Sequence, residues 1–264
     1  MGCKMEYIKA FVMGVIVIMM VLNVTGVEEK NEKSEEENRR QQVIKKLEKH
    51  YDNRILEFKE ENRNLKNIIL LGDSLTEGFD IEKYFPERRV LNRGIVADHV
   101  GTGERGILRR LDCSVFNCNP SHVYLLIGVN DLGDDNSQEA VKQISETYRE
   151  ICKRILNEEP EIKLYLQSCL PTGNNYARLN ESIISLNEEI KIIAKDMNLE
   201  YIDLHSLMKD ENGELRDDLT REGLHLKPAG YDIWRKALEP HLPPVHTDKT
   251  NLEKMTGNKT ESEI

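Results

Sequence analysis

A serine in the segment Gly72-Asp73-Ser74-Leu75-Thr76 comes directly after the apolar run Asn67 to Leu71. A serine at the turn between a strand and a helix can present its hydroxyl to solvent, while its own N–H faces a developing oxyanion. Such a residue could be the nucleophile of an acyl-transfer reaction. The alternative is that Asp73 and Ser74 only cap a helix, and this segment alone does not separate the two roles.

A histidine with a nearby carboxylate occurs late in the chain, in Glu222-Gly223-Leu224-His225-Leu226. A carboxylate can orient a histidine through Nδ1 while Nε2 takes the proton of a serine hydroxyl. His225 is therefore the candidate general base, and Glu222 is the candidate orienting acid.

Two further segments could donate hydrogen bonds to an oxyanion. The segment Asn92-Arg93-Gly94-Ile95 contains a glycine, at which the backbone can approach a ligand with an unobstructed N–H. The segment Gly128-Val129-Asn130-Asp131 offers the side-chain amide of Asn130. Taken alone, each segment would pass as an ordinary turn.

The elements that must position these residues are five short apolar runs that alternate with helical patterns. Runs of this length, flanked by Gly, Asn, Asp and Pro, predict buried strands. They are Ile68 to Leu71, Arg89 to Leu91, Val123 to Ile127, Lys163 to Gln167 and Glu200 to Leu204. Apolar residues at intervals of three and four predict helices over Ser137 to Asn157, Asn180 to Met197 and Pro228 to Leu242. This alternation predicts a parallel sheet with ligands bound beyond the carboxyl ends of its strands, where all four polar segments fall.

In order along the chain, the four segments resemble the four blocks of the SGNH, or GDSL-type, serine hydrolase family, and the resemblance covers residues 65 to 242. It implies a three-layer α/β/α fold of the flavodoxin-like kind, with a five-stranded parallel sheet and no metal or cofactor. It also implies Ser74 as nucleophile, His225 as general base, and an oxyanion hole formed by the N–H of Ser74, the N–H of Gly94 and the side chain of Asn130. The stretches most similar to the branch of platelet-activating-factor acetylhydrolases and carbohydrate O-acetyl esterases are Leu125 to Leu132, Tyr165 to Pro171 and Leu224 to Trp234.

One residue departs from the family pattern, which has aspartate where this chain has Glu222. Glutamate is longer by one methylene, so it reaches Nδ1 only if the loop retreats or the side chain bends. Asp217 and Asp218 are the alternative acids, and a serine and histidine dyad without a carboxylate is a third option.

The chain ends differ in composition from this central segment. Residues 1–27 have a basic start and an apolar run from Ala10 to Leu22, which predicts an export signal or, alternatively, an uncleaved anchor. Residues 28–64 combine a charged linker with an amphipathic helix, in which Val43, Leu47, Tyr51, Ile55 and Phe58 share one face. That face would pack on the main domain or, less convincingly over so short a run, on a second copy. Residues 243–264 are polar and predicted to be a disordered tail.

Charge and cysteine content exclude several classes of protein. The 264 residues carry a formal net charge of -10, and residues 67–242 hold 31 acidic and 21 basic side chains, so the whole excess lies in the central domain. A nucleic-acid partner is not expected, because such partners require concentrated Lys and Arg. The five cysteines lack the paired spacing of a zinc site. Cys113 and Cys118 could form a disulfide, whereas Cys152 and Cys169 are expected to be buried thiols.

The sequence therefore predicts an exported serine esterase that removes a short acyl group, foremost acetyl, from a carbohydrate or another polar ester. No long apolar insert that could form a lipid groove is present near the four segments. A lysophospholipase or thioesterase of the same family is the alternative, and a catalytically silent binding module on a helical stalk is the rival from another class. The expected partner is the small-molecule or glycan ester itself, with membrane contact only through an N-terminal anchor; the sequence does not predict an oligomeric state.

Overall fold

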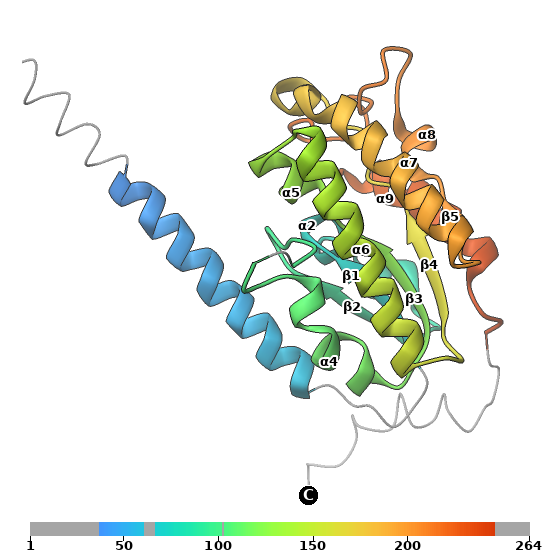
Figure 1. Ribbon diagram of the computed structural model, residues 1–264. Coiled ribbons are helices and arrows are strands. Elements are labelled where there is room, and N and C mark those ends of the chain that lie inside the picture. Colours follow the sequence, from blue (N-terminus) through green and yellow to red (C-terminus); the bar gives the residue numbers. More distant parts are fainter. Residues whose placement is uncertain (1–36, 61–66, 102, 246–264) are drawn as a thin grey trace, which may run out of the picture. The chain divides into compact units, whose positions relative to one another are not determined.

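The computed structural model describes residues 37–60, 67–101 and 103–245 (Figure 1). The predicted leader over residues 1–27 and nearly all of the predicted tail lie outside the described residues. The chain divides into two units between Asp52 and Asn53. Within the described ranges, no helix has the length and apolar content needed to cross a membrane.

The unit that begins at Asn53 is built on a five-stranded parallel sheet with strand order β2-β1-β3-β4-β5. The strands are β1 (Asn67–Gly72), β2 (Val90–Gly94), β3 (Pro120–Leu126), β4 (Lys163–Gln167) and β5 (Glu200–Ile202). The α-helices between and after them are α2 (Ser74–Glu77), α3 (Ile81–Tyr84), α4 (Leu111–Ser114), α5 (Val129–Asp134), α6 (Gln138–Glu158), α7 (Asn180–Asp196), α8 (Leu204–Met208) and α9 (Pro228–Leu238). Short 3-10 turns cover Ile107–Arg109, Phe116–Cys118, Asn174–Leu179 and Glu239–His241. A further helix covers residues 37–60.

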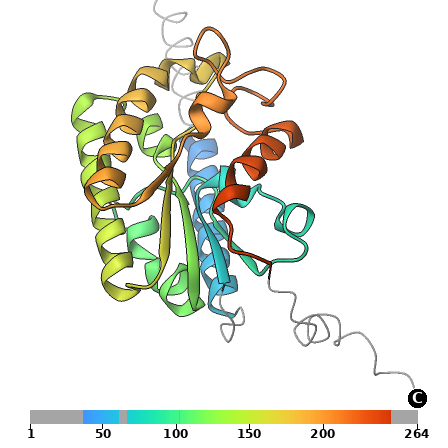
Figure 2. The ribbon, with the colours of Figure 1, turned by 90° about the vertical axis from the view of Figure 1, so that its right-hand side faces the viewer.

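Helices cover both faces of the sheet, which gives the predicted three layers (Figure 2). Side chains alternate along each strand, so Ile69 and Leu71 of β1 enter the apolar core shared with α6 and α7. Their neighbours Ile68 and Leu70 enter the opposite core, which includes Trp234 of α9. Strands buried on both faces explain why the sequence shows continuous apolar runs rather than alternation.

The longest predicted helix forms for the reasons that its sequence suggests. The Ser137 hydroxyl caps α6 by accepting the N–H of Ala140 at 3.1 Å. Val141, Ile144, Tyr148, Ile151 and Ile155 are buried along one face of α6. The helix ends at Glu158, two residues before Pro160. Helix α7 likewise covers Asn180–Asp196, within one residue of its predicted end.

Three predicted carboxyl ends were wrong by two or more residues, and the third strand begins at Pro120 rather than Val123. The second strand does not end at Leu91 but runs to Gly94, because Asn92, Arg93 and Gly94 continue the pairing with β1. The fifth strand ends at Ile202, since the carboxylate of Asp203 caps α8 by accepting the N–H of Ser206. Helix α9 ends at Leu238 rather than Leu242, as Pro240 lacks the N–H that would continue it.

The four described cysteines, Cys113, Cys118, Cys152 and Cys169, are free and buried. The disulfide considered for Cys113 and Cys118 is therefore not formed, whereas the prediction for Cys152 and Cys169 is confirmed. Burial raises the pKa of the Cys152 thiol to about 12, so this side chain stays a neutral core residue.

Candidate active site

The predicted nucleophile lies at the carboxyl end of β1, as the first residue of α2. The carboxylate of Asp73 caps this short helix by accepting the N–H of Leu75 at 2.9 Å. The cap and the nucleophile are therefore adjacent residues, and the capping alternative applies to Asp73 alone. The Ser74 side chain is half-buried, and its N–H has no hydrogen-bond partner among the described residues.

The structure brings His225 to Ser74 across 151 positions of sequence: Nε2 of His225 lies 3.1 Å from Oγ of Ser74. The other ring nitrogen, Nδ1, hydrogen-bonds to Oε1 of Glu222. The same Oε1 accepts the backbone N–H of His225 at 3.1 Å. Serine, histidine and glutamate thus form a continuous hydrogen-bonded chain.

Neither alternative acid has a hydrogen bond to His225 among the described residues. Both carboxylate oxygens of Asp218 accept hydrogen bonds from the guanidinium of Arg216, at 3.1 and 2.8 Å. The backbone carbonyl of Asp217 accepts a hydrogen bond from Nζ of Lys227. Among the three carboxylates considered from the sequence, Glu222 is the one in contact with His225.

The loop that carries Glu222 and His225 is held by its own backbone. Thr220 and Leu226 form an antiparallel bridge, and the N–H of Arg221 donates to the carbonyl of His225 at 3.0 Å. Gly223 lies between the acid and the base with φ of 100°, and a Cβ at this position would lie 2.2 Å from the carbonyl oxygen of Gly173. Only glycine suits this turn, because it adopts positive φ without strain and needs no side-chain space.

The predicted donor Gly94 is not brought to the nucleophile as a free N–H. Its N–H donates to Oδ1 of Asn92 at 2.9 Å. Alternate residues of a strand face opposite sides, and the N–H of Ile95 faces β1 by donating to the carbonyl of Gly72. The N–H of Gly94 therefore faces the open side of β2, away from the strand that carries Ser74.

Ala97, three residues later, was not singled out from the sequence but is a second candidate for a backbone donor. Ile95 to Asp98 form a turn in which the N–H of Asp98 donates to the carbonyl of Ile95 at 3.2 Å. Ala97 has φ of 59° in this turn, and its N–H has no partner among the described residues. A non-glycine residue at positive φ could not be recognised from the residue type, which is why the sequence pointed to Gly94 instead.

The third predicted donor, Asn130, lies in the first turn of α5, which follows β3. Its Nδ2 donates one hydrogen bond to the carbonyl of Asp98 at 2.9 Å, which leaves the second N–H of the amide for another acceptor. The side chain of Asn130 is therefore bonded to the residue that follows Ala97.

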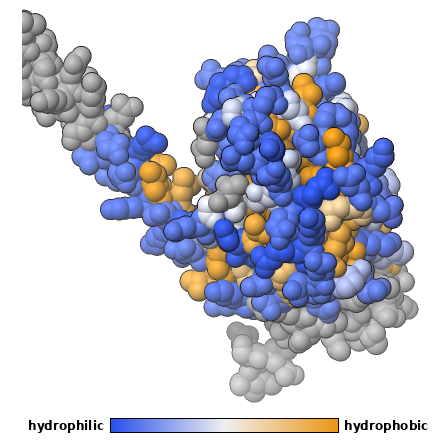
Figure 3. Space-filling model, in the orientation of Figure 1, coloured by the Kyte–Doolittle hydropathy of each residue, from blue (hydrophilic) through white to orange (hydrophobic). Residues whose placement is uncertain are grey.

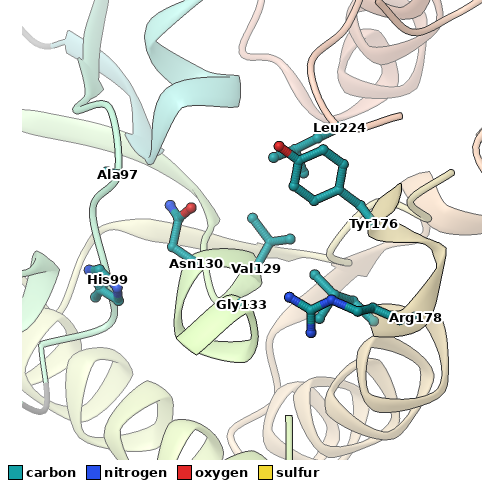
Figure 4. A pocket seen from close by; sticks show the side chains of 9 residues that line it. Ala97, His99, Val129, Asn130, Gly133, Tyr176, Arg178 and Leu224 are labelled. Atoms are coloured by element: carbon teal, nitrogen blue, oxygen red, sulfur yellow. The ribbon is translucent and has the colours of Figure 1, made fainter. Parts of the chain in front are cut away.

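A cavity of about 280 Å³ lies beside these groups (Figure 4). Asn130 and Val129 form its middle, and Leu224, which precedes His225, is on its wall. The other lining residues are Ala97, His99, Gly133, Tyr176, Arg178 and Leu179. Tyr176 and Arg178 were not singled out from the sequence, because neither belongs to a recognisable segment.

Buried charged residues hold the turn that carries Ala97. Asp98 is held by Arg110, with Nη2 2.7 Å from Oδ2, and Arg110 also donates to the carbonyls of Gly72 and Arg93 at 3.0 Å. Asp131 accepts the N–H of Val100. Burial raises the pKa of Asp73 to about 7 and that of Asp131 to about 6, and it raises the pKa of Asp98 against the opposing effect of Arg110.

Comparison with known proteins identifies the family to which the chain belongs. Residues 70–233, which contain all the groups described above, match the GDSL-like lipase/acylhydrolase family. The chain belongs to this family. It is a hydrolase of ester bonds, and the resemblance seen in the sequence is confirmed.

Solved structures similar to this GDSL hydrolase include a Streptococcus pneumonia protein whose structure is named as a platelet activating factor. That protein is 26% identical, with a TM-score of 0.69, over 77% of this chain and 97% of its own. An acetylxylan esterase from Geobacillus stearothermophilus is 20% identical, with a TM-score of 0.53, over 67% of this chain and 94% of its own. At this identity, the second comparison supports the fold alone.

A curated relative is the N-acylneuraminate cytidylyltransferase of Escherichia coli O18:K1:H7 (strain RS218 / NMEC). It is 26% identical over 184 residues, which make up 69% of this chain and 41% of that protein. The chain thus spans about two fifths of the length of this relative.

Proposed function

We propose that this GDSL hydrolase removes a short acyl group, foremost acetyl, from a carbohydrate or another polar alcohol by acyl transfer through Ser74. The observation that carries the proposal is the hydrogen-bonded chain from Glu222 through His225 to Ser74, beside a small cavity. Nucleophile, base and orienting acid are the three roles that such a reaction needs.

In the first step, Nε2 of His225 takes the proton of the Ser74 hydroxyl while Oγ attacks the carbonyl carbon of the ester. Glu222 accepts the Nδ1–H and stabilises the imidazolium that forms. Burial would raise the pKa of Glu222, but the hydrogen bonds from His225 lower it below its usual value. The acid is therefore ionised at neutral pH, as this role requires.

The oxyanion of the tetrahedral intermediate accepts hydrogen bonds from the N–H of Ser74, the N–H of Ala97 and Nδ2 of Asn130. Ala97 takes the place that the sequence suggested for Gly94, because its N–H is unpartnered among the described residues whereas that of Gly94 is engaged by Asn92. Donors fixed before the reaction stabilise the developing charge without reorganisation.

The intermediate then collapses. The bond between the carbonyl carbon and the alcohol oxygen breaks, and the alcohol leaves with the proton held on His225. Water attacks the resulting acyl-serine while His225 removes its proton, and the free acid leaves as Oγ of Ser74 regains a proton.

The size of the cavity favours a short acyl group. A cavity of about 280 Å³ is at the lower end of small-molecule sites. Solved structures of similar fold include acetylxylan esterases. We also propose that the enzyme acts outside the cytoplasm, on the basis of the leader predicted over residues 1–27; the N-terminal sequence of the mature protein tests this.

Acetate release from a panel of acetylated glycans by the full chain, with p-nitrophenyl acetate as a general substrate, tests the function. We expect Ser74→Ala to lower turnover by at least about three orders of magnitude and Asn130→Ala by about 10²- to 10³-fold. Ser185→Ala is the matched control, because the hydroxyl of this half-buried serine donates to the carbonyl of Glu181 within α7.

A fluorophosphonate probe should label wild type and Ser185→Ala but not Ser74→Ala. Absence of labelling in wild type would favour the silent binding module. Preference for lysophospholipids or thioesters over acetylated glycans would favour the alternatives within the family and contradict the proposed substrate.

A further inference from the structure

The sheet has an open edge next to the active site, because β2 is the terminal strand and pairs only with β1 (Figure 1). On its open side, β2 presents the backbone carbonyls of Asn92 and Gly94. Unpaired carbonyls at a sheet edge need another donor. Here the donor is Arg54, whose Nη2 lies 3.2 Å from the carbonyl oxygen of Asn92 and 3.3 Å from that of Gly94.

Arg54 belongs to the helix over residues 37–60 and lies six residues before its end. Its Nε also donates to the carbonyl of Gly94 at 3.4 Å, and its Nη1 pairs with Glu57 at 2.6 Å. A planar guanidinium with five donors can engage several acceptors at once, which a lysine cannot do in the same geometry.

Phe58, one turn later on the same helix, is fully buried. Its ring centre lies 4.7 Å from the guanidinium carbon of Arg54 and 4.5 Å from that of Arg93. Arg110, which holds Asp98, is 5.8 Å away. Cation–π contacts of this kind are stronger when they are shielded from water, so Phe58 anchors the helix end among three arginines.

Arg54 and the end of β2 also contact α2, the helix that begins at Ser74. Nε of Arg54 is 3.9 Å from Oε1 of Glu77, the last residue of α2, and Oε2 of Glu77 accepts the N–H of Val96 at 2.6 Å. Nδ2 of Asn92 donates to the carbonyls of Thr76, Glu77 and Phe79. The side chains of Asn92 and Glu77 thus join the end of β2 to the helix that begins at Ser74. Arg54 contacts the backbone carbonyl of Asn92 and lies near the carboxylate of Glu77.

We propose that Arg54 and Phe58 are positioning residues for the oxyanion hole. They fix residues 92–96, and therefore the N–H of Ala97, against helix α2. The inference rests on the proposed function and extends it: part of the N-terminal helix belongs to the catalytic apparatus rather than to a stalk. A displacement of about 1 Å in a catalytic group can cost about 10²-fold in rate.

Kinetics of Arg54→Ala on p-nitrophenyl acetate test the proposal in the full-length protein. We expect kcat to fall about tenfold while KM stays within about twofold, because an oxyanion hole acts in the transition state rather than in substrate binding. Arg54→Lys should recover part of the loss, since an ammonium can reach one carbonyl but not both. Arg40→Ala, at an exposed arginine of the same helix, is the matched control and should leave kcat unchanged.

Amide hydrogen exchange provides a readout that does not depend on hydrolysis. We expect faster exchange of residues 92–98 in Arg54→Ala and in Phe58→Leu than in wild type or Arg40→Ala, with the rest of the sheet unchanged. Equal exchange in all four proteins, or a kcat of Arg54→Ala equal to that of Arg40→Ala, would overturn the proposal. If wild type does not hydrolyse esters, the proposed function fails, and exchange still decides whether Arg54 holds the segment.

Discussion

At the scale of single residues, one methylene separates Glu222 from the aspartate that the family pattern has at this position. The longer side chain is accommodated because a single oxygen, Oε1, accepts both Nδ1–H and the backbone N–H of His225. The acid is therefore fixed to the backbone of the residue that it orients.

Substitution of each carboxylate in turn distinguishes Glu222 from the other candidate acids. We expect Glu222→Ala to lower kcat/KM for p-nitrophenyl acetate by about 10²-fold or more, because the histidine loses the group that fixes its tautomer and stabilises its charge. Asp218→Ala should be close to wild type, since that carboxylate pairs with Arg216. Loss of activity in Asp218→Ala alone would show that the assigned acid is wrong.

At the scale of elements, the turn after β2 matters more than the strand itself. Among the described residues, the four non-glycine residues with positive φ are Ala97 and three asparagines. Asparagine tolerates this conformation through local hydrogen bonds, whereas alanine has no such compensation. The turn that presents the proposed oxyanion donor is therefore strained at the donor residue.

Ala97→Gly tests that strain. We expect the variant to be more stable by about 0.5–1 kcal/mol, because relief of the left-handed conformation outweighs the greater freedom of glycine in the unfolded chain. Activity should persist, since the N–H remains. Urea denaturation measures the effect, and Ala194→Gly inside α7 is the control, expected to lose about 1 kcal/mol. Destabilisation of both variants would argue against strain at Ala97.

The same turn explains how far the sequence could predict the site. The roles proposed for Ser74, Asn130, Glu222 and His225 belong to side chains in short segments of recognisable type and order, so the sequence was informative about them. The donor N–H after β2 depends on which side of the strand each residue faces, and that depends on where the strand ends. Asn92 and Gly94 are typical loop residues, and only the pairing with β1 shows that the strand includes them. Arg54 contacts backbone carbonyls, which leave no trace in the pattern of side chains.

At the scale of the whole molecule, the protein buries three carboxyl groups close to its active site. The surface in Figure 3 is predominantly hydrophilic, with separated hydrophobic patches. Beneath the active site, however, Asp73, Asp98 and Asp131 are buried near one another, with Arg110 paired to Asp98. Oδ2 of Asp73 has no hydrogen-bond partner among the described residues. Burial of an unpaired carboxylate favours its protonated form.

This arrangement predicts that the stability of the domain depends on pH through Asp73. Its pKa rises from 3.8 to about 7 in the folded protein, so between these values the folded state holds a proton that the unfolded state has released. The contribution is fully present below about pH 4 and is lost as pH rises to about 7, at a rate of up to about 1.4 kcal/mol per pH unit. Asp73→Asn removes this titration.

Denaturant unfolding of wild type and Asp73→Asn at pH 5, 6, 7 and 8 measures the effect. We expect the free energy of unfolding of the variant to increase relative to wild type from pH 5 to pH 7 and then to stay level. Asp131, whose pKa is raised to about 6, is present in both proteins. Asp232→Asn, at an exposed position of α9, should show no such trend. A constant difference between Asp73→Asn and wild type across this range would mean that Asp73 is ionised in the folded protein.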